Sequence, residues 1–300
     1  MHIKNSDRLI DERRKECNLM QSKLNAMTVD VEDYFQVSAF EPFIKKSSWD
    51  SMECRVENNT SRLLDLFGKH GVQATFFTLG WVAERYPALI KRIVEEGHEL
   101  ASHGYDHVRV TQQSPDEFRA DVTKTKKILE DISGQEIKGY RAASYSIKKE
   151  NLWALEILHE TGHAYSSSIY PVKHDLYGIP DAPRYAYYPF GEDSILEIPI
   201  TTLNIFGKNL PAGGGGFFRL YPYSFSRWAL ARINKVDKES GMFYFHPWEI
   251  DPDQPKTPGI NAKTRFRHYL NLDKFYQRLE QLLQDFSWDR MDKVFLKENA

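Results

Sequence analysis

The sequence predicts an α/β fold in which helices cover a parallel β-sheet. Runs rich in β-branched and aromatic residues alternate with helical segments between residues 26 and 160. The connections between them are short, and this alternation is typical of right-handed βαβ units. The length of 300 residues fits one large α/β domain or two small ones, and it is enough to bury a substantial core.

The first predicted strand begins at Ala26, in a short β-prone run that passes directly into carboxylates. We expect a helix next, with its N-cap among residues 59–61, an apolar face ending near Lys69, and Gly71 as its C-terminal stop. Residues 72–79 are again rich in β-formers. Strand and helix therefore alternate from the start of the domain.

The later elements follow from the same signals. A strong helix start lies at Ser114, where Pro115 follows the N-cap and Glu117 closes a capping box. Further helices are predicted over about 82 or 87–96, 115–131, 149–160, 223–240 and 273–286, and further strands over 98–101, 137–141, 194–200 and 241–249. The four glycines at 213–216 match neither a Walker loop nor a dinucleotide fingerprint, so we expect a mobile loop there.

Composition excludes several classes of protein. The formal net charge of −2 gives no electrostatic case for nucleic-acid binding, and two cysteines imply no disulfide framework. Residues 1–24 form a charged leader, expected to be flexible, without the apolar core of a secretory signal, and no run is long and apolar enough to span a membrane. We therefore expect a cytoplasmic protein whose oligomeric state the sequence leaves open.

A candidate metal site lies after the predicted strand 98–101. His103 and His107 stand four residues apart, and neutral imidazole is a common metal ligand. Ser102 and Gly104 favour a loop at the end of that strand, where α/β enzymes keep their active sites. A catalytic site needs a third protein ligand, and we expect a carboxylate from another strand end; the alternative is a chance histidine pair.

Three carboxylates, Asp30, Glu32 and Asp33, follow the first predicted strand. Inside a buried strand they would repel one another and suffer from desolvation, whereas beside a cation at a strand end they are tolerable. A solvated acidic turn is the alternative.

The ordered motifs at residues 28–33, 103–107, 141–145 and 245–247 together resemble the polysaccharide deacetylases of the NodB-homology group, carbohydrate esterase family 4. They read Thr-Val-Asp-Val-Glu-Asp, His-Gly-Tyr-Asp-His, Arg-Ala-Ala-Ser-Tyr and Phe-His-Pro, and the match covers about residues 26–250. The resemblance implies a distorted (β/α)7 barrel, a divalent metal, and hydrolysis of an N-acetyl group on an amino sugar.

Within that family the chain is similar to the subgroup that accompanies exosortase-linked exopolysaccharide clusters. The segments that suggest this are 30–35, 170–178 and 212–219. An exopolysaccharide or its precursor is therefore the expected N-acetylated saccharide partner.

The resemblance also implies roles for single residues. Asp30 matches the general base, His246 the general acid, Arg141 the residue that orients the base, and His103 and His107 the paired metal ligands.

The third ligand is Glu32 or Asp33, because Val31 stands where the family usually has a second Asp; we favour Glu32. Zinc is the expected metal, with cobalt, nickel or manganese as alternatives. We expect substrate contacts from Ser144, Tyr145, His174 and Trp248, with a backbone N–H near Ser144 holding the oxyanion.

These expectations place one deacetylase domain at residues 25–290, with a loop-rich C-terminal insertion. Serines at 166–168 replace the acidic residue that relatives usually offer to the arginine network. Two other functions stay open: an allantoinase-like amidohydrolase acting on a small cyclic amide, and a catalytically inactive sugar-binding module.

Overall fold

The computed structural model describes residues 23–174 and 177–296. The predicted leader lies almost entirely outside the described residues.

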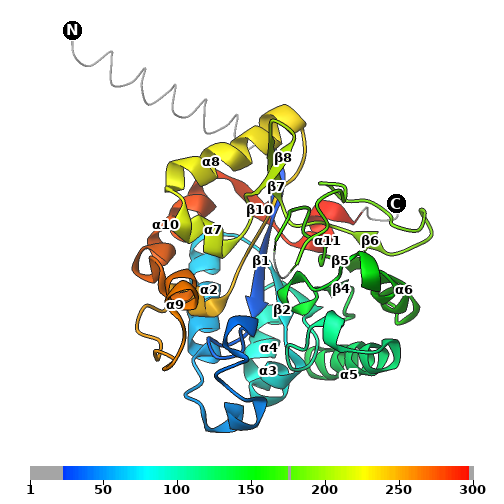
Figure 1. The fold of residues 1–300 in the computed structure, drawn as a ribbon, viewed down its shortest axis with the longest axis vertical. Coiled ribbons are helices and arrows are strands. Elements are labelled where there is room, and N and C mark those ends of the chain that lie inside the picture. The colour runs from blue at the N-terminus through cyan, green and yellow to red at the C-terminus, as the bar shows by residue number, and fades with distance from the viewer. Residues whose placement is uncertain (1–22, 175–176, 297–300) are drawn as a thin grey trace.

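A curled parallel sheet forms the centre of the molecule, with helices ranged around it (Figure 1). Its strand order is β10-β1-β2-β3-β4-β5-β6, and β9 pairs with β1 off this path. The strands are β1 (Leu24–Val31), β2 (Thr75–Thr78), β3 (Glu99–Ser102), β4 (Gly139–Tyr140), β5 (Tyr165–Ser166), β6 (Leu196–Glu197), β9 (Met242–Phe245) and β10 (Ser287–Asp289). The predicted α/β class and parallel sheet are confirmed.

Helices of six to nineteen residues and one shorter helix connect or flank these strands. They are α2 (Val56–His70), α3 (Gly80–Arg85), α4 (Pro87–Glu95), α5 (Pro115–Ser133), α6 (Trp153–Glu160), α7 (Gly215–Leu220), α8 (Tyr223–Arg232), α9 (Ala262–Tyr269), α10 (Leu272–Asp285) and α11 (Met291–Phe295). A separate antiparallel hairpin consists of β7 (Thr202–Ile205) and β8 (Lys208–Pro211). In the described part of the chain, none of the helices combines the length and hydrophobicity needed to cross a membrane.

The barrel is open between β6 and β9, since no ladder joins these two strands among the described residues. Single contacts cross the gap instead. The backbone of Met242 donates to the Thr201 hydroxyl (2.6 Å), and Gly214 forms an isolated bridge with Tyr244. The wall of the barrel is thus completed by irregular chain rather than by another strand.

The start of α2 differs from the prediction. We expected an N-cap among residues 59–61, but the helix begins at Val56, and Asn59 and Thr60 are buried within it. The carboxylate of Asp33 accepts hydrogen bonds from the backbone of Arg55 (2.6 Å) and Val56 (2.9 Å). The cap therefore comes from 22 residues earlier, which no local pattern around the helix could indicate.

Other boundaries follow the sequence signals to different degrees. The capping box at Ser114 is confirmed, and Gly71 and Gly134 end α2 and α5 in the left-handed conformation. The helix expected to end at residue 96 is two helices that meet at Tyr86, and α8 stops at Arg232 before a π-helical turn. The predicted strands 137–141 and 194–200 shorten to two residues each.

The expectation of a mobile loop at the four glycines is wrong. Gly214 lies in the bridge to Tyr244, and Gly215 is the first residue of α7. A Cβ atom on Gly213 would lie 2.3 Å from the Met242 carbonyl, and one on Gly214 would lie 2.7 Å from the Tyr244 ring. Glycine is required here because two segments approach too closely for any side chain, rather than for mobility.

Candidate active site

The site lies at the carboxyl end of β1, a central strand of the sheet. This strand pairs with β2 and β9, and β2 pairs in turn with β3, so the carboxyl ends of these parallel strands open at one edge. Glu32 follows β1, His103 follows β3 and His246 follows β9. Residues far apart in sequence thereby meet.

Glu32, His103 and His107 form a compact buried cluster. One ligand atom from each lies within 4.8 Å of the others, and Glu32 Oε2 lies 2.9 Å from His107 Nε2. Two imidazole nitrogens and a carboxylate oxygen are the donor set of many catalytic zinc sites, so these residues fit a divalent cation. His107 has a φ of 60°, a left-handed conformation that is rare outside glycine and is found at functional sites.

The local environment prepares these side chains for ligation. The Arg141 carbonyl lies 2.8 Å from His103 Nδ1, and because a carbonyl can only accept, Nδ1 carries the proton and Nε2 keeps its lone pair. Burial lowers the pKa of His103 to about 4. Burial raises the pKa of Glu32, but the imidazoles of His107 and His246 outweigh this and bring it to about 2.

Asp33 does not join this cluster. Its carboxylate is occupied by three backbone amides, those of Arg55, Val56 and Tyr34. Burial raises its pKa to about 6. Of the two candidates for the third ligand, the structure brings only Glu32 to the histidines.

Asp30 lies beside the cluster and is held by Arg141. Arg141 Nη1 donates to Asp30 Oδ1 (2.5 Å), and the guanidinium is completely buried. The hydroxyl of Tyr145 lies 3.4 Å from Asp30 Oδ2. The second carboxylate oxygen of Asp30 thus lies on the side of the other site residues.

Arg141 finds its support in a serine loop. Its Nη2 donates to the Ser167 hydroxyl (3.2 Å) and its Nε to the Ser167 carbonyl (3.3 Å). The loop is fixed in turn by Glu197, whose Oε1 accepts from the backbone of Ser168 (2.9 Å) and Ile169 (2.7 Å). The sequence analysis missed Glu197; its signal was a lone carboxylate inside the apolar run 195–198.

His246 completes the site opposite Asp30. Its Nε2 lies 3.5 Å from Glu32 Oε1 and 3.9 Å from Asp30 Oδ2. On its other side, Nδ1 lies 2.9 Å from Glu249 Oε1, and Arg219 donates to Oε2 of the same carboxylate (2.6 Å). Burial lowers the pKa of His246, but Glu32 and Glu249 outweigh this and raise it to about 9, which favours the imidazolium at neutral pH.

The sequence analysis also missed Glu249 and Arg219. Glu249 stands three residues after His246, a spacing that closes a capping box around Pro247 and could have been noticed. Arg219, at the end of α7, carried no comparable signal.

The residues that we expected to contact the substrate differ in how close they lie to the site. Tyr145 lies in the site, and Ser144 bonds through its hydroxyl to that of Ser38 (2.7 Å). His174 stacks on Tyr177, whose ring centroid is 6.1 Å from that of Tyr145, so His174 stands two rings away from the site.

Trp248 is unsuited to the sugar contact that we expected. Its indole stacks on the rings of His246 and His268, with centroid separations of 5.1 and 4.2 Å. Its Nε1 donates to Glu32 Oε1 (3.4 Å). Because Trp248 is only 6% exposed, it positions site residues and leaves little surface on which a sugar could stack.

Two family models match this chain. Residues 46–165 match the model described as polysaccharide deacetylase, and residues 167–296 match one described as a domain of unknown function, DUF3473. A peptidoglycan-N-acetylglucosamine deacetylase of Bacillus cereus is 39% identical over 98 residues, 32% of this chain and 36% of that protein. Residues 46–165 are thus similar to the polysaccharide deacetylase family. The predicted resemblance to polysaccharide deacetylases is thus supported over residues 46–165, while the exosortase-associated subgroup stays a prediction.

Further proteins are similar to part of the chain or to its fold. A chitooligosaccharide deacetylase of Bradyrhizobium is 31% identical over 99 residues, 33% of this chain and 43% of that protein. The matched segments thus span less than half of these relatives. A crystal structure from Mycobacterium smegmatis, described as a polysaccharide deacetylase, superposes with a TM-score of 0.58 at 19% identity and covers 92% of this chain and 89% of that chain. This likeness confirms the barrel fold that the resemblance implied.

The two matched regions build a single sheet. They meet at β5, and β9 and β10 from the second region pair with β1, which precedes both. The second region supplies His246, Glu249, Arg219 and the serine loop around Arg141. The site is therefore incomplete without the region of unknown function.

Proposed function

We propose that this chain is a metal-dependent deacetylase that removes N-acetyl groups from amino sugars of an exopolysaccharide or its precursor. The observation that carries the proposal is the placement of a carboxylate, Asp30, and a histidine, His246, beside the cluster of Glu32, His103 and His107. The relatives named as N-acetylglucosamine deacetylases support an amino sugar as the substrate.

Three side chains would hold the metal: Glu32, His103 and His107. The chemistry that a divalent ion supplies at such a site is a lowered pKa for water and polarisation of the acyl oxygen. Zinc is the expected ion, as the two imidazoles favour it among the alternatives cobalt, nickel and manganese.

Asp30 is the proposed general base. Its carboxylate would take a proton from the attacking water, and the buried guanidinium of Arg141 orients it. A base fixed in this way needs no rearrangement when the substrate binds.

His246 is the proposed general acid. An amine is a poor leaving group unless it is protonated, so cleavage of the amide needs a proton donor on the side of the departing nitrogen. Glu249 holds His246 in its protonated form and Arg219 holds Glu249. A backbone N–H near Ser144 is the proposed oxyanion donor, a kind of contact worth about 2.7–4 kcal/mol.

The two alternatives fit less well. A sugar-binding module has no need of an acid and a base arranged around a metal-ligand cluster. An allantoinase-like activity would use a similar cluster, but the matched relatives are named for deacetylation of saccharides.

The deciding experiment is release of acetate from N-acetylated oligosaccharides by the purified protein, before and after chelation and again after zinc is restored. Acetate release that chelation removes and zinc restores is the expected result. Activity that chelation leaves unchanged would contradict metal dependence, and hydrolysis of allantoin without acetate release would favour the alternative.

The expected cytoplasmic location adds a constraint on substrate size. A cytoplasmic enzyme would meet a short lipid-linked or nucleotide-linked precursor rather than a finished polymer. We therefore expect faster deacetylation of short N-acetylhexosamine oligomers than of long polymer, together with recovery of the native protein in the cytoplasmic fraction. Periplasmic recovery, or a preference for long polymer, would overturn this part of the proposal alone.

A further inference from the structure

A cavity of about 200 Å³ adjoins the metal-ligand cluster. The loop between β1 and α2 forms most of it, and His107 forms part of its wall. One water needs roughly 10–15 Å³ of such space, so the cavity has room for a group of several atoms. The mechanism proposed above makes no use of it.

Two buried hydrogen-bond donors that line this cavity have no acceptor. Gln36 is 2% exposed; its Oε1 accepts from the backbone of Asp33 (2.7 Å), which fixes the orientation of the amide and leaves Nε2 without a partner. Trp49 is 5% exposed, and its Nε1, which can only donate, is also unpartnered. A buried donor without an acceptor is unfavourable, so the pair favours a ligand with acceptor atoms.

His107 adds a third donor. Its Nε2 faces Glu32, while Nδ1 has no partner. When Nε2 serves as a ligand atom, Nδ1 must carry the proton, and metal-bound imidazoles usually donate that proton to a carboxylate or carbonyl. A group held in the cavity is therefore separated from the reaction centre by one imidazole ring.

The charged side chains around the cavity include one ammonium group that has no acidic partner among the described residues. Its two acidic residues are each paired, Glu41 with Arg109 (2.7 Å) and Asp106 with Lys46 (2.9 Å). Lys45 is exposed at the rim and forms no ion pair with any described residue. Three donors and a spare ammonium group together suit an anion with more than one acceptor oxygen.

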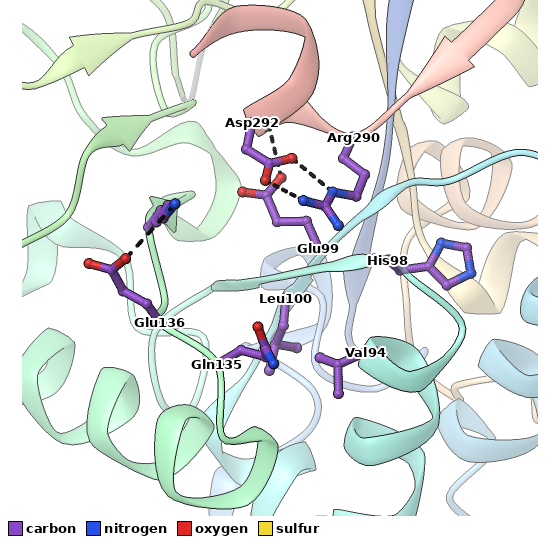
Figure 2. A pocket seen from close by; sticks show the side chains of 9 residues that line it. Val94, His98, Glu99, Leu100, Gln135, Glu136, Arg290 and Asp292 are labelled. Carbon is purple, nitrogen blue, oxygen red and sulfur yellow. Dashed lines mark hydrogen bonds and ion pairs between the residues drawn. The ribbon is translucent and has the colours of Figure 1, made fainter. Parts of the chain in front are cut away.

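A larger cavity, of about 300 Å³, makes a useful contrast at the opposite end of the sheet (Figure 2). Its charged residues satisfy one another: Arg290 pairs with Asp292 (2.5 Å), whose backbone N–H donates to Glu99 (3.2 Å). Glu99 also accepts from Tyr165 (3.0 Å). Among the described residues that line this larger cavity, no buried donor lacks an acceptor, whereas the smaller cavity has three such donors.

We propose that the cavity lined by Gln36, Trp49 and His107 binds a carboxylate carried by the saccharide, so that the enzyme acts preferentially on N-acetyl groups within an acidic chain. This inference rests on the proposed deacetylase function. It adds a property of the substrate, an acid group close to the reacting N-acetyl group.

Binding of D-glucuronate to the full-length protein, measured by titration calorimetry, tests the cavity without catalysis. The methyl ester of the same sugar is the neutral control. Gln36→Glu keeps an acceptor for Asp33 but replaces the donor with a negative charge, and it should weaken glucuronate binding by about tenfold or more. Lys45→Met at the rim should weaken it by a few-fold, and Lys91→Met on α4, an exposed lysine remote from the cavity, should leave it unchanged.

The catalytic test compares kcat/KM for a neutral N-acetylglucosamine oligomer with that for an oligomer of equal length that alternates with glucuronic acid. Wild type should prefer the acidic oligomer, and Gln36→Glu should reduce that ratio by about tenfold. The ratio is informative even where the variant loses stability, since both substrates meet the same protein.

Three results would overturn parts of the argument in distinguishable ways. Equal binding of glucuronate and its ester would overturn the cavity assignment. Equal kcat/KM for acidic and neutral oligomers would do so while leaving the deacetylase function intact. Glucuronate binding that Gln36→Glu removes, without deacetylation of any N-acetylated saccharide, would overturn the function and leave carboxylate binding in place.

Discussion

The half-buried His246 and the buried Glu249 form a pair at the end of β9, with 2.9 Å between Nδ1 and Oε1. Arg219 forms an ion pair with the other oxygen of the Glu249 carboxylate. The negative charge of Glu249 therefore favours the protonated form of the proposed acid, His246. Arg219 in turn fixes the position of Glu249.

Glu249→Gln should move the alkaline limb of the pH–activity profile to lower pH. Activity needs the protonated imidazole and falls as the pH rises through its pKa. Glu249 raises that pKa, so its removal should shift the fall in kcat/KM downward by about one pH unit or more. Profiles measured with an N-acetyl oligosaccharide provide the check.

The matched control is Glu57→Gln, an exposed glutamate on α2. An aryl acetate, whose leaving group departs without a proton, should show a smaller shift than the amide in the Glu249→Gln enzyme. An unchanged alkaline limb in Glu249→Gln would contradict the role of His246 as the acid.

Glu32→Gln should lower metal content far more than Asp33→Asn. The site offers three protein ligands, so loss of Glu32, His103 or His107 should weaken binding by orders of magnitude. Asp33 instead caps α2, and its substitution should cost about 0.5–2 kcal/mol of stability with full metal occupancy. Elemental analysis and thermal unfolding of the same samples separate the two effects.

Full metal content in Glu32→Gln, or loss of metal in Asp33→Asn, would reverse the ligand assignment. Alanine at His103 or His107 with undiminished metal content would remove the metal centre from the proposal altogether.

Asp30→Asn should abolish turnover while the metal stays bound. The amide cannot accept a proton from water at neutral pH, although it preserves the shape and one acceptor oxygen. Arg141 then keeps a hydrogen bond but loses its buried counter-charge, so some loss of stability is expected too. Wild-type acetate release by a folded, metal-loaded Asp30→Asn protein would rule out Asp30 as the base.

How far the sequence predicted the site depends on whether the residues signalled their partners locally. His103 and His107 are four residues apart, and Asp30 and Glu32 follow one predicted strand, so the pattern of β-prone runs alone indicated that all four lie at strand ends. The capping-box pattern at Ser114 likewise predicted the start of α5.

The supporting residues could not be predicted in this way. Glu197 fixes the serine loop and Arg219 fixes Glu249, and these bonds span 29 and 30 residues of sequence. Gln36 and Trp49 became candidates only when their donors were found buried without acceptors. These roles depend on which chain segments meet in the folded barrel, information that composition and periodicity do not carry.

Gly215→Ala should disturb the proposed acid from a distance. A Cβ at Gly215 would lie 2.2 Å from Glu249 Oε1, so the carboxylate would have to move from His246. We expect a fall in kcat/KM on amide substrates and an alkaline limb shifted in the same direction as in Glu249→Gln. Gly216→Ala, the next residue of α7, has no atom within 4 Å of its new Cβ and should be neutral or stabilising by up to about 1 kcal/mol. If both variants behaved alike, the glycine run would matter for the helix alone; a loss confined to Gly215→Ala would tie it to the acid.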